Sequence, residues 1–387
     1  MVVGLWPAVA VALSLSDNLH VHGFASQSLV HASGNKLGDG SNRGVSTEFR
    51  ELGSGFTWLP APEWTVSAQA LSRWHGESDS GAMRLDYGFV DKRVISTQES
   101  ALGVRVGKIK NPYGLYNESR DVPHARPGIL MPQSVYMDRA RSLWLSANGV
   151  ALYGHRYSED SLITAQLNVI KPESDSMDLS YLVVGEPGKL EGRASWLGQL
   201  TYSISPKARV GLSLAQLRFG FGPQPASRLL PGNTQLTAAL LSAEIASANW
   251  AAVFEYGQAQ VDSRNYGNSR QAMVIEMDNT VESGYAQLTR RLGPNWEAFL
   301  RYDVFFSDKN DRYGKRLQQL TGAPESALYY RFAKDATVGV RWTKGPWSWA
   351  GEWHNVTGTA WLSPLEIVGE TPSRKWDVFL LQGAWRF

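Results

Sequence analysis

Charged side chains gather in one long polar stretch of this chain, residues 112–147, and in the strand-like segment that precedes it. The basic members are Arg105, Lys108, Lys110, Arg120, His124, Arg126, Arg139 and Arg141, and the acidic members are Glu118, Asp121 and Asp138. Fixed charges at a narrow passage bias the movement of ions by their sign. The local excess is positive, which predicts a weak preference for anions. The alternative is that these basic side chains pair with the nearby carboxylates and only brace the stretch.

Signs of enzymatic chemistry are weak in this sequence. It contains no G-x-S-x-G, G-x-x-x-x-G-K-[ST], G-x-G-x-x-G or H-E-x-x-H motif. His20 and His22 could share a strand face but have no carboxylate partner, and the acids near Asp308 do not fit the spacing of a calcium loop. The chain has no Cys, and its net charge of +2 offers no basic surface for nucleic acid. We therefore expect no metal, no cofactor, no nucleic-acid partner and no catalytic residue.

The elements that position these charges are strands, because alternation is the main pattern in the chain. Within residues 162–170, Ile163, Leu167 and Val169 share one face, and Thr164 lies on the other. A strand with one face to lipid and the other to an aqueous interior must alternate in this way. Beyond the N-terminus there is no apolar run of about 18 residues, which excludes a bundle of membrane helices.

The alternating segments number about sixteen, and single-chain bacterial barrels have an even number of strands. They span 21–32, 44–58, 64–75, 83–96, 101–110, 148–158, 161–171, 191–205, 207–219, 234–248, 250–263, 280–292, 295–307, 329–344, 347–361 and 376–387. Short turns that contain Pro alternate with long polar stretches at 112–147, 172–190, 220–233, 264–279, 308–328 and 362–375. The sequence thus predicts an all-β, transmembrane antiparallel barrel with short periplasmic turns and long extracellular loops.

The N-terminus differs from the rest of the chain. Residues 2–15 form an apolar stretch of signal-peptide length, but no Lys or Arg precedes it and no A-x-A cleavage site follows. We interpret residues 1–19 as a degraded signal peptide and residues 20–387 as a single barrel. The alternative is that the apolar stretch is a first strand or a plug segment.

The last alternating segment ends on Phe387. Phe387, Trp385 and Leu381 fall on one face, and Gln382 and Arg386 fall on the other. A terminal aromatic residue on an alternating strand resembles the signal that the bacterial outer-membrane barrel assembly machinery reads. This resemblance implies that the machinery is a partner through Phe387 and that the protein resides in the bacterial outer membrane. Pairing of this strand with the first one would remove an exposed sheet edge.

A second resemblance lies in Gly107-Lys-Ile-Lys-Asn-Pro-Tyr-Gly-Leu-Tyr-Asn-Glu-Ser-Arg-Asp-Val122, followed by Arg126-Pro127 and Pro132-Gln-Ser-Val-Tyr136. This segment is similar to one in bacterial outer-membrane porins, broadly the general-diffusion and phosphate-selective group. The resemblance implies a barrel of sixteen strands, often a homotrimer, with one loop folded inward to narrow the pore. The chain lacks the extended N-terminal segment and the arginine ladder of phosphate-selective members, so strong phosphate specificity is not expected.

A barrel of that size is too wide for its wall side chains to fill, so another segment must narrow it. Residues 112–147 are the candidate constriction loop, and Arg301, Asp303, Arg341 and Glu352 are candidate pore-wall residues. The expected function is a porin that lets small polar or anionic solutes diffuse passively, surrounded by outer-membrane lipid and lipopolysaccharide. Two alternatives stay open: an outer-membrane lipid hydrolase that uses His155 or His354, and a soluble all-β binding protein.

Overall fold

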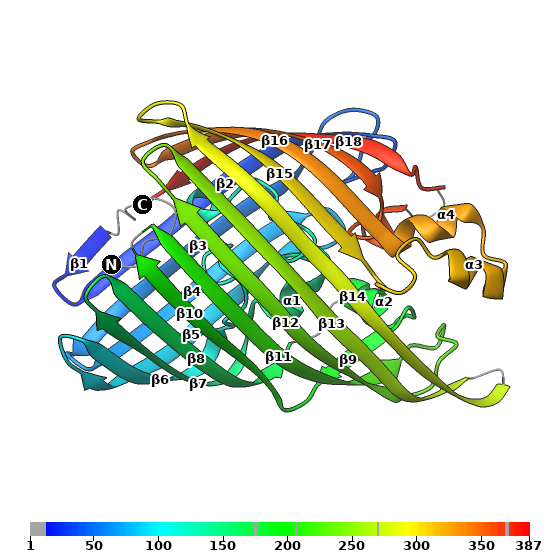
Figure 1. Cartoon of the computed structure of the whole chain (residues 1–387), viewed down its shortest axis with the longest axis horizontal. Coiled ribbons are helices and arrows are strands. Elements are labelled where there is room, and N and C mark those ends of the chain that lie inside the picture. The colour runs from blue at the N-terminus through cyan, green and yellow to red at the C-terminus, as the bar shows by residue number, and fades with distance from the viewer. Residues whose placement is uncertain (1–12, 174–176, 206, 269–270, 368–370) are drawn as a thin grey trace.

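The computed structural model describes residues 13–173, 177–205, 207–268, 271–367 and 371–387. These residues form a closed antiparallel barrel of sixteen wall strands (Figure 1). The wall strands are β2 (Leu19–Ser33), β3 (Ser46–Ala61), β4 (Trp64–His75), β5 (Ser80–Ser96), β6 (Ser100–Lys110), β7 (Ser146–Ser158), β8 (Ser161–Pro172), β10 (Ser195–Ser205), β11 (Ala208–Pro223), β12 (Gly232–Ala246), β13 (Trp250–Asn268), β14 (Gln271–Arg291), β15 (Trp296–Phe306), β16 (Phe332–Lys344), β17 (Trp347–Gly358) and β18 (Lys375–Arg386). Each predicted segment overlaps one of them, so the predicted fold class is confirmed.

The barrel closes between its last and first wall strands. β18 pairs antiparallel with β2, with Gln382 opposite Ser28. Just beyond β18, the backbone of Phe387 exchanges two hydrogen bonds of 3.0 Å with Gly23. Because every wall strand has two neighbours, the wall presents no unpaired edge.

The two faces of the wall follow the alternation of the sequence. On β18, Leu381 and Trp385 point outward and are exposed, whereas Gln382 and Arg386 point inward and are buried. The same division holds on β8, where Leu167 is exposed and Asn168 is buried. The outer face is therefore apolar and the inner face is mixed, as a barrel in a membrane requires.

The two rims differ in the way the sequence predicts. Seven exposed Trp side chains lie at or near the short turns: Trp58, Trp64, Trp250, Trp296, Trp347, Trp349 and Trp385. Such rings favour the boundary between membrane and water. The longer connections carry α2 (Met177–Val183), α3 (Lys315–Thr321) and α4 (Glu325–Leu328), and Figure 1 shows α3 and α4 at the opposite end from the chain termini. Among the described residues, no helix is long and apolar enough to cross a bilayer.

The structure corrects two details of the expected strand pattern. The prediction of a loop at 264–279 is wrong. Strands β13 and β14 continue through most of this range as a paired hairpin, with Tyr266 opposite Ile275. This part of the hairpin is rich in polar residues, so its composition resembles that of a loop. The segment expected at 191–205 is divided between β10 and a short strand, β9 (Gly188–Gly192), which pairs with the end of β11.

The N-terminal leader stays a prediction. Most of residues 1–19 lie outside the described part of the chain. The part that is described forms β1 (Leu13–Ser16), a short strand antiparallel to the start of β2.

Candidate constriction site in the barrel lumen

The long connection between β6 and β7, residues 111–145, folds into the barrel and is here called the inward loop. It carries η1 (Pro123–Ala125), η2 (Asp138–Ala140) and α1 (Arg141–Trp144), and most of its side chains are buried. The loop lies inside the barrel, so its side chains are buried by contact with the inner wall and with neighbouring loops. The expected inward fold of one loop is confirmed.

Asn117 ties the two ends of the inward loop together. Its side-chain amide donates hydrogen bonds to the backbone oxygens of Asn111 (2.9 Å) and Trp144 (2.7 Å). The Asn111 N–H also donates to the Leu145 oxygen at 2.9 Å. Nearby, the rings of Tyr113 and Trp144 stack with their centres 4.3 Å apart. The loop therefore leaves and re-enters the wall through a closed neck.

Across the lumen, Glu255 on β13 anchors two segments of the inward loop, one near its start and one beyond its tip. Its fully buried carboxylate accepts hydrogen bonds from the Tyr136 hydroxyl (2.6 Å) and the Leu115 N–H (3.0 Å). Two wall hydroxyls, those of Ser242 (2.6 Å) and Tyr285 (2.8 Å), donate to the same carboxylate. Glu255 thus joins loop and wall through one group.

The tip of the inward loop is held by side chains from β14 to β17. Glu352 accepts hydrogen bonds from the N–H groups of Ile129 and Leu130. Asp303 accepts from the Ser134 N–H at 3.2 Å. In addition, Arg341 donates to the Arg126 oxygen at 2.7 Å, and Gln287 donates to the Pro127 oxygen at 3.0 Å. The loop therefore crosses the whole lumen and is fastened on both sides.

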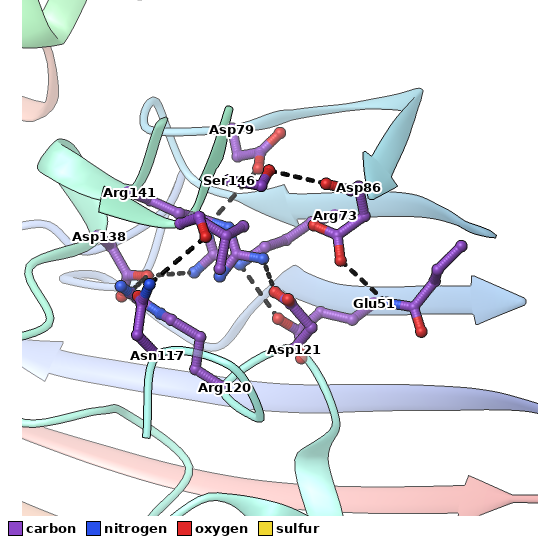
Figure 2. Close-up of polar contacts among 12 residues, drawn as sticks. Glu51, Arg73, Asp79, Asp86, Asn117, Arg120, Asp121, Asp138, Arg141 and Ser146 are labelled. Atoms are coloured by element: carbon purple, nitrogen blue, oxygen red, sulfur yellow. Dashed lines mark hydrogen bonds and ion pairs between the residues drawn. The ribbon is translucent and has the colours of Figure 1, made fainter. Parts of the chain in front are cut away.

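On the opposite side, the inward loop meets β3, β4, β5 and β6 in a set of ion pairs, called here the lumen network (Figure 2). Its basic members are Arg73, Lys110, Arg120, Arg126 and Arg141, and its acidic members are Glu51, Asp79, Asp86, Asp121 and Asp138. Arg73 lies 3.0 Å from Glu51 and 2.7 Å from Asp138, so one wall guanidinium bridges the wall and the loop. The five basic and five acidic members have formal charges that cancel.

The network shifts the ionisation of its loop members. Burial alone would raise the pKa of Asp138, but Arg73 and Arg120 outweigh burial and hold that pKa well below its usual range. Burial, reinforced by the charges of Arg73 and Arg126, lowers the pKa of Arg120 to about 10. Both groups therefore stay charged at neutral pH.

The structure brings together only some of the candidate constriction residues. Lys110, Arg120, Asp121, Arg126 and Arg141 meet in the lumen network. The others lie elsewhere: Arg105 pairs with Asp91 at 2.7 Å, Lys108 with Glu173 at 2.7 Å, and Arg139 with Asp178 at 2.8 Å, while Glu118 is exposed. Arg139 also donates to the Ala360 oxygen, which ties the inward loop to the connection before β18.

The candidate wall residues Arg301, Asp303, Arg341 and Glu352 all lie on the inner face and are buried. Asp303, Arg341 and Glu352 contact the inward loop as described above, whereas Arg301 donates to the Thr337 hydroxyl on β16 at 3.4 Å. Among the described residues, no group of three or more His, Asp or Glu side chains is arranged to hold a metal ion.

Sequence reasoning missed several residues of the site. Glu51, Arg73, Asp86 and Glu255 were not singled out, although each occupies the inner face of a predicted strand. The signal that could have found them is a charged residue in the polar phase of an alternating segment, since such a side chain must point into the lumen. This signal shows that the side chain faces the lumen, but it does not show which residue the side chain contacts there.

Comparisons with known proteins show a shared fold. No family model matches the chain, and no curated protein matches its sequence. The anion-selective porin from Comamonas acidovorans superposes with a TM-score of 0.57 at 12% identity, over 95% of this chain and 99% of the porin. OmpF of Salmonella typhi, solved with daunomycin, gives 0.56 at 10% identity over 97% and 100%. The outer membrane channel DcaP of Acinetobacter baumannii gives 0.53 at 11% identity over 97% and 99%.

Proposed function

The chain has the fold of bacterial outer-membrane porins, and we propose that it is an outer-membrane channel through which small hydrophilic solutes diffuse passively, with a weak preference for anions. The observation that carries this proposal is the inward loop, which is fastened on both sides of a closed barrel. A barrel of this size without such a loop would leave a wide aqueous passage. A loop that is attached to the wall on both sides leaves a passage that is narrow and of fixed width.

The weak preference for anions is supported by a charge that the lumen network leaves accessible. Arg105 is half-buried on the inner face of β6, and its guanidinium lies over the Tyr153 ring at 4.2 Å. Its carboxylate partner, Asp91, reduces the field of this charge. Because the buried arginines of the loop are paired as well, the expected preference is small.

Planar-bilayer recordings of the purified protein test the channel. We expect stepwise conductance that is small for a barrel of this size, because the inward loop fills much of the lumen. In a salt gradient, the reversal potential should favour anions slightly. A protein that inserts fully but stays silent would refute the channel, and a reversal potential that favours cations would refute only the selectivity.

The lipid-hydrolase alternative receives no support from the positions of its two histidines. His354 is buried on the inner face of β17, where it bonds to Asp335 (2.7 Å) and Glu352 (3.1 Å). His155 stands opposite Thr164 in the register of β7 and β8 and packs against Tyr157. A hydrolase of membrane lipid needs its nucleophile and base on the outer wall. Release of fatty acid from lipid vesicles by the purified protein would revive this alternative.

Partners of the barrel are part of the same proposal. The paired end of β18 supports recognition of Phe387 by the barrel assembly machinery, and the apolar outer wall supports contact with outer-membrane lipid and lipopolysaccharide. A homotrimer is proposed only from the resemblance to porins. Light scattering of the protein in detergent, corrected for bound detergent, distinguishes a trimer from a monomer.

A further inference from the structure

A small cavity lies within the lumen network, between the inward loop and strands β2, β3, β4 and β18. Its volume is about 20 Å³, and its charged lining includes Arg73, Arg120, Arg126 and Arg141 against only Glu51 and Asp138. A single water-sized particle needs roughly 10–15 Å³ of such volume. The cavity therefore has room for one small particle and none for a polyatomic solute.

Several guanidinium N–H groups at this cavity have no acceptor. Among the described residues, no hydrogen-bond partner reaches Nη1 of Arg73, Nε and Nη1 of Arg120, or Nε of Arg141. All three side chains are almost fully buried. Figure 2 shows their head groups close together between Asp138 and Asp121. A buried donor without an acceptor costs about 1–3 kcal/mol, and more when it is charged.

The carboxylate acceptors at the cavity are already used. Oε1 of Glu51 accepts hydrogen bonds from Arg73 and Arg126, and Oε2 accepts the Ser26 hydroxyl and lies 2.8 Å from Arg126. Both oxygens of Asp138 are occupied as well, Oδ1 by Arg73 at 2.7 Å and Oδ2 by Gln133 at 2.9 Å. The cavity thus offers an excess of charged donors and no free carboxylate oxygen.

This imbalance distinguishes an anion from a water molecule. Water brings two hydrogens that themselves need acceptors, whereas a monatomic anion only accepts. An anion also offsets the repulsion among three guanidinium groups in a poorly hydrated site, where charges interact more strongly than in bulk water. The volume of the cavity and its excess of hydrogen-bond donors therefore both favour a small anion.

We propose that one small monovalent anion, chloride or bromide in size, binds in this cavity between Arg73, Arg120 and Arg141 and fastens the inward loop to the wall. Arg73 belongs to β4, while Arg120 and Arg141 belong to the loop, so the ion bridges the two parts. The site goes beyond the proposed channel function, because the ion is a stationary component of the fold. It would persist in a barrel that conducts nothing.

The first test measures stability of the purified, folded protein in detergent at constant ionic strength. Sodium chloride is exchanged stepwise for sodium gluconate, whose anion is too large for the cavity. A ligand that binds only the folded state raises stability with its concentration in a saturable way. We expect the thermal midpoint to rise along a saturable curve with chloride and with bromide, but not with gluconate or sulfate. Equal midpoints in all four salts would overturn the proposal.

A variant separates the ion from the general effect of salt. Gln382 lines the cavity from β18 and donates to the Ser28 hydroxyl at 3.0 Å. In Gln382→Glu, a fixed carboxylate would accept the Ser28 hydroxyl and supply the missing negative charge. We expect this variant to lose the chloride dependence. The matched control, Gln166→Glu, adds the same charge on β8, which contributes no lining residue, and should keep the dependence.

If Gln382→Glu fails to fold, diffraction from crystals of the unaltered protein grown in bromide tests the anion site directly. Bromide scatters anomalously, so an anomalous peak between the three guanidinium groups would support the site. A peak absent there but present at other bromide positions would overturn it. Loss of the chloride dependence in both variants would also overturn it, because the effect would then not depend on the cavity.

Discussion

Replacing Tyr136 by Phe removes a single oxygen atom from the buried contact between the inward loop and the wall. The Tyr136 hydroxyl donates to Glu255 at 2.6 Å and accepts the N–H groups of Leu115 (2.8 Å) and Tyr116 (3.1 Å). Leu115 keeps a second acceptor in Glu255, but Tyr116 loses the acceptor described for it. The shape of the side chain is otherwise unchanged, so the substitution isolates the hydrogen bonds.

The expected cost follows from these contacts. A hydrogen bond to a charged acceptor contributes about 1.5–3 kcal/mol, and a buried N–H left without a partner costs about 1–3 kcal/mol. Taking the lower part of their sum, about 3 kcal/mol, the population with a detached loop should rise roughly 150-fold, since each 1.36 kcal/mol is about tenfold. The barrel wall should stay intact, because its own hydrogen bonds are untouched.

Hydrogen–deuterium exchange of the protein in detergent, read by mass spectrometry, measures this population. Exchange of buried amides follows the fraction of time for which they open, so peptides covering 112–136 should exchange about two orders of magnitude faster in Tyr136→Phe. Tyr285→Phe is the matched control, because it removes an equivalent donor to Glu255 that comes from the wall. If both variants accelerate loop exchange equally, or neither does, the anchoring role of Tyr136 is refuted.

Four further outcomes follow from the same structure. Asn117→Ala removes two neck hydrogen bonds and should cost about 2 kcal/mol of loop attachment, seen as faster amide exchange at both loop ends. Deletion of Phe387 should lower the yield of heat-resistant barrel in the outer-membrane fraction, whereas retention of full yield would contradict its role in assembly. Arg105→Glu should shift the reversal potential toward cations, and it should also lower the thermal midpoint, because it places a like charge beside the buried Asp91. Because the pKa of Asp138 is depressed in the fold, its contribution is complete above its unfolded value, about 3.9, and is lost as pH falls toward the folded value; loop exchange should therefore accelerate only in strong acid.

The strands could be predicted because the face on which a side chain lies is a local property. Successive residues of a strand point to opposite sides whatever their neighbours are, so a short alternating run such as 162–170 is sufficient. The hairpin of β13 and β14 shows where this fails. Residues 264–279 lack a regular apolar alternation, yet they form part of a paired hairpin in which Tyr266 lies opposite Ile275.

The site was harder to predict because its contacts are distant along the chain. Arg73 meets Asp138 across 65 residues, and Tyr136 meets Glu255 across 119. Such pairings depend on the number of strands, on their register and on the path of the loop, none of which a single segment encodes. The sequence pattern therefore identified the loop and most of its basic residues, but not the wall carboxylates that neutralise them.

That neutralisation changes which residues can influence a passing ion. A guanidinium held by buried carboxylates, like Arg126 against Glu51 at 2.8 Å, is already compensated, and moving it toward a solute would leave a buried charge unpaired. The half-buried Arg105 can respond at lower cost, because water still reaches it. Since Asp91 and dissolved salt both screen it, its effect should be modest and should fade as ionic strength rises. If the proposed anion preference holds, the arginines that hold the inward loop differ from the one that acts on a passing ion. Substitution of Arg105 should therefore alter selectivity while the inward loop stays in place.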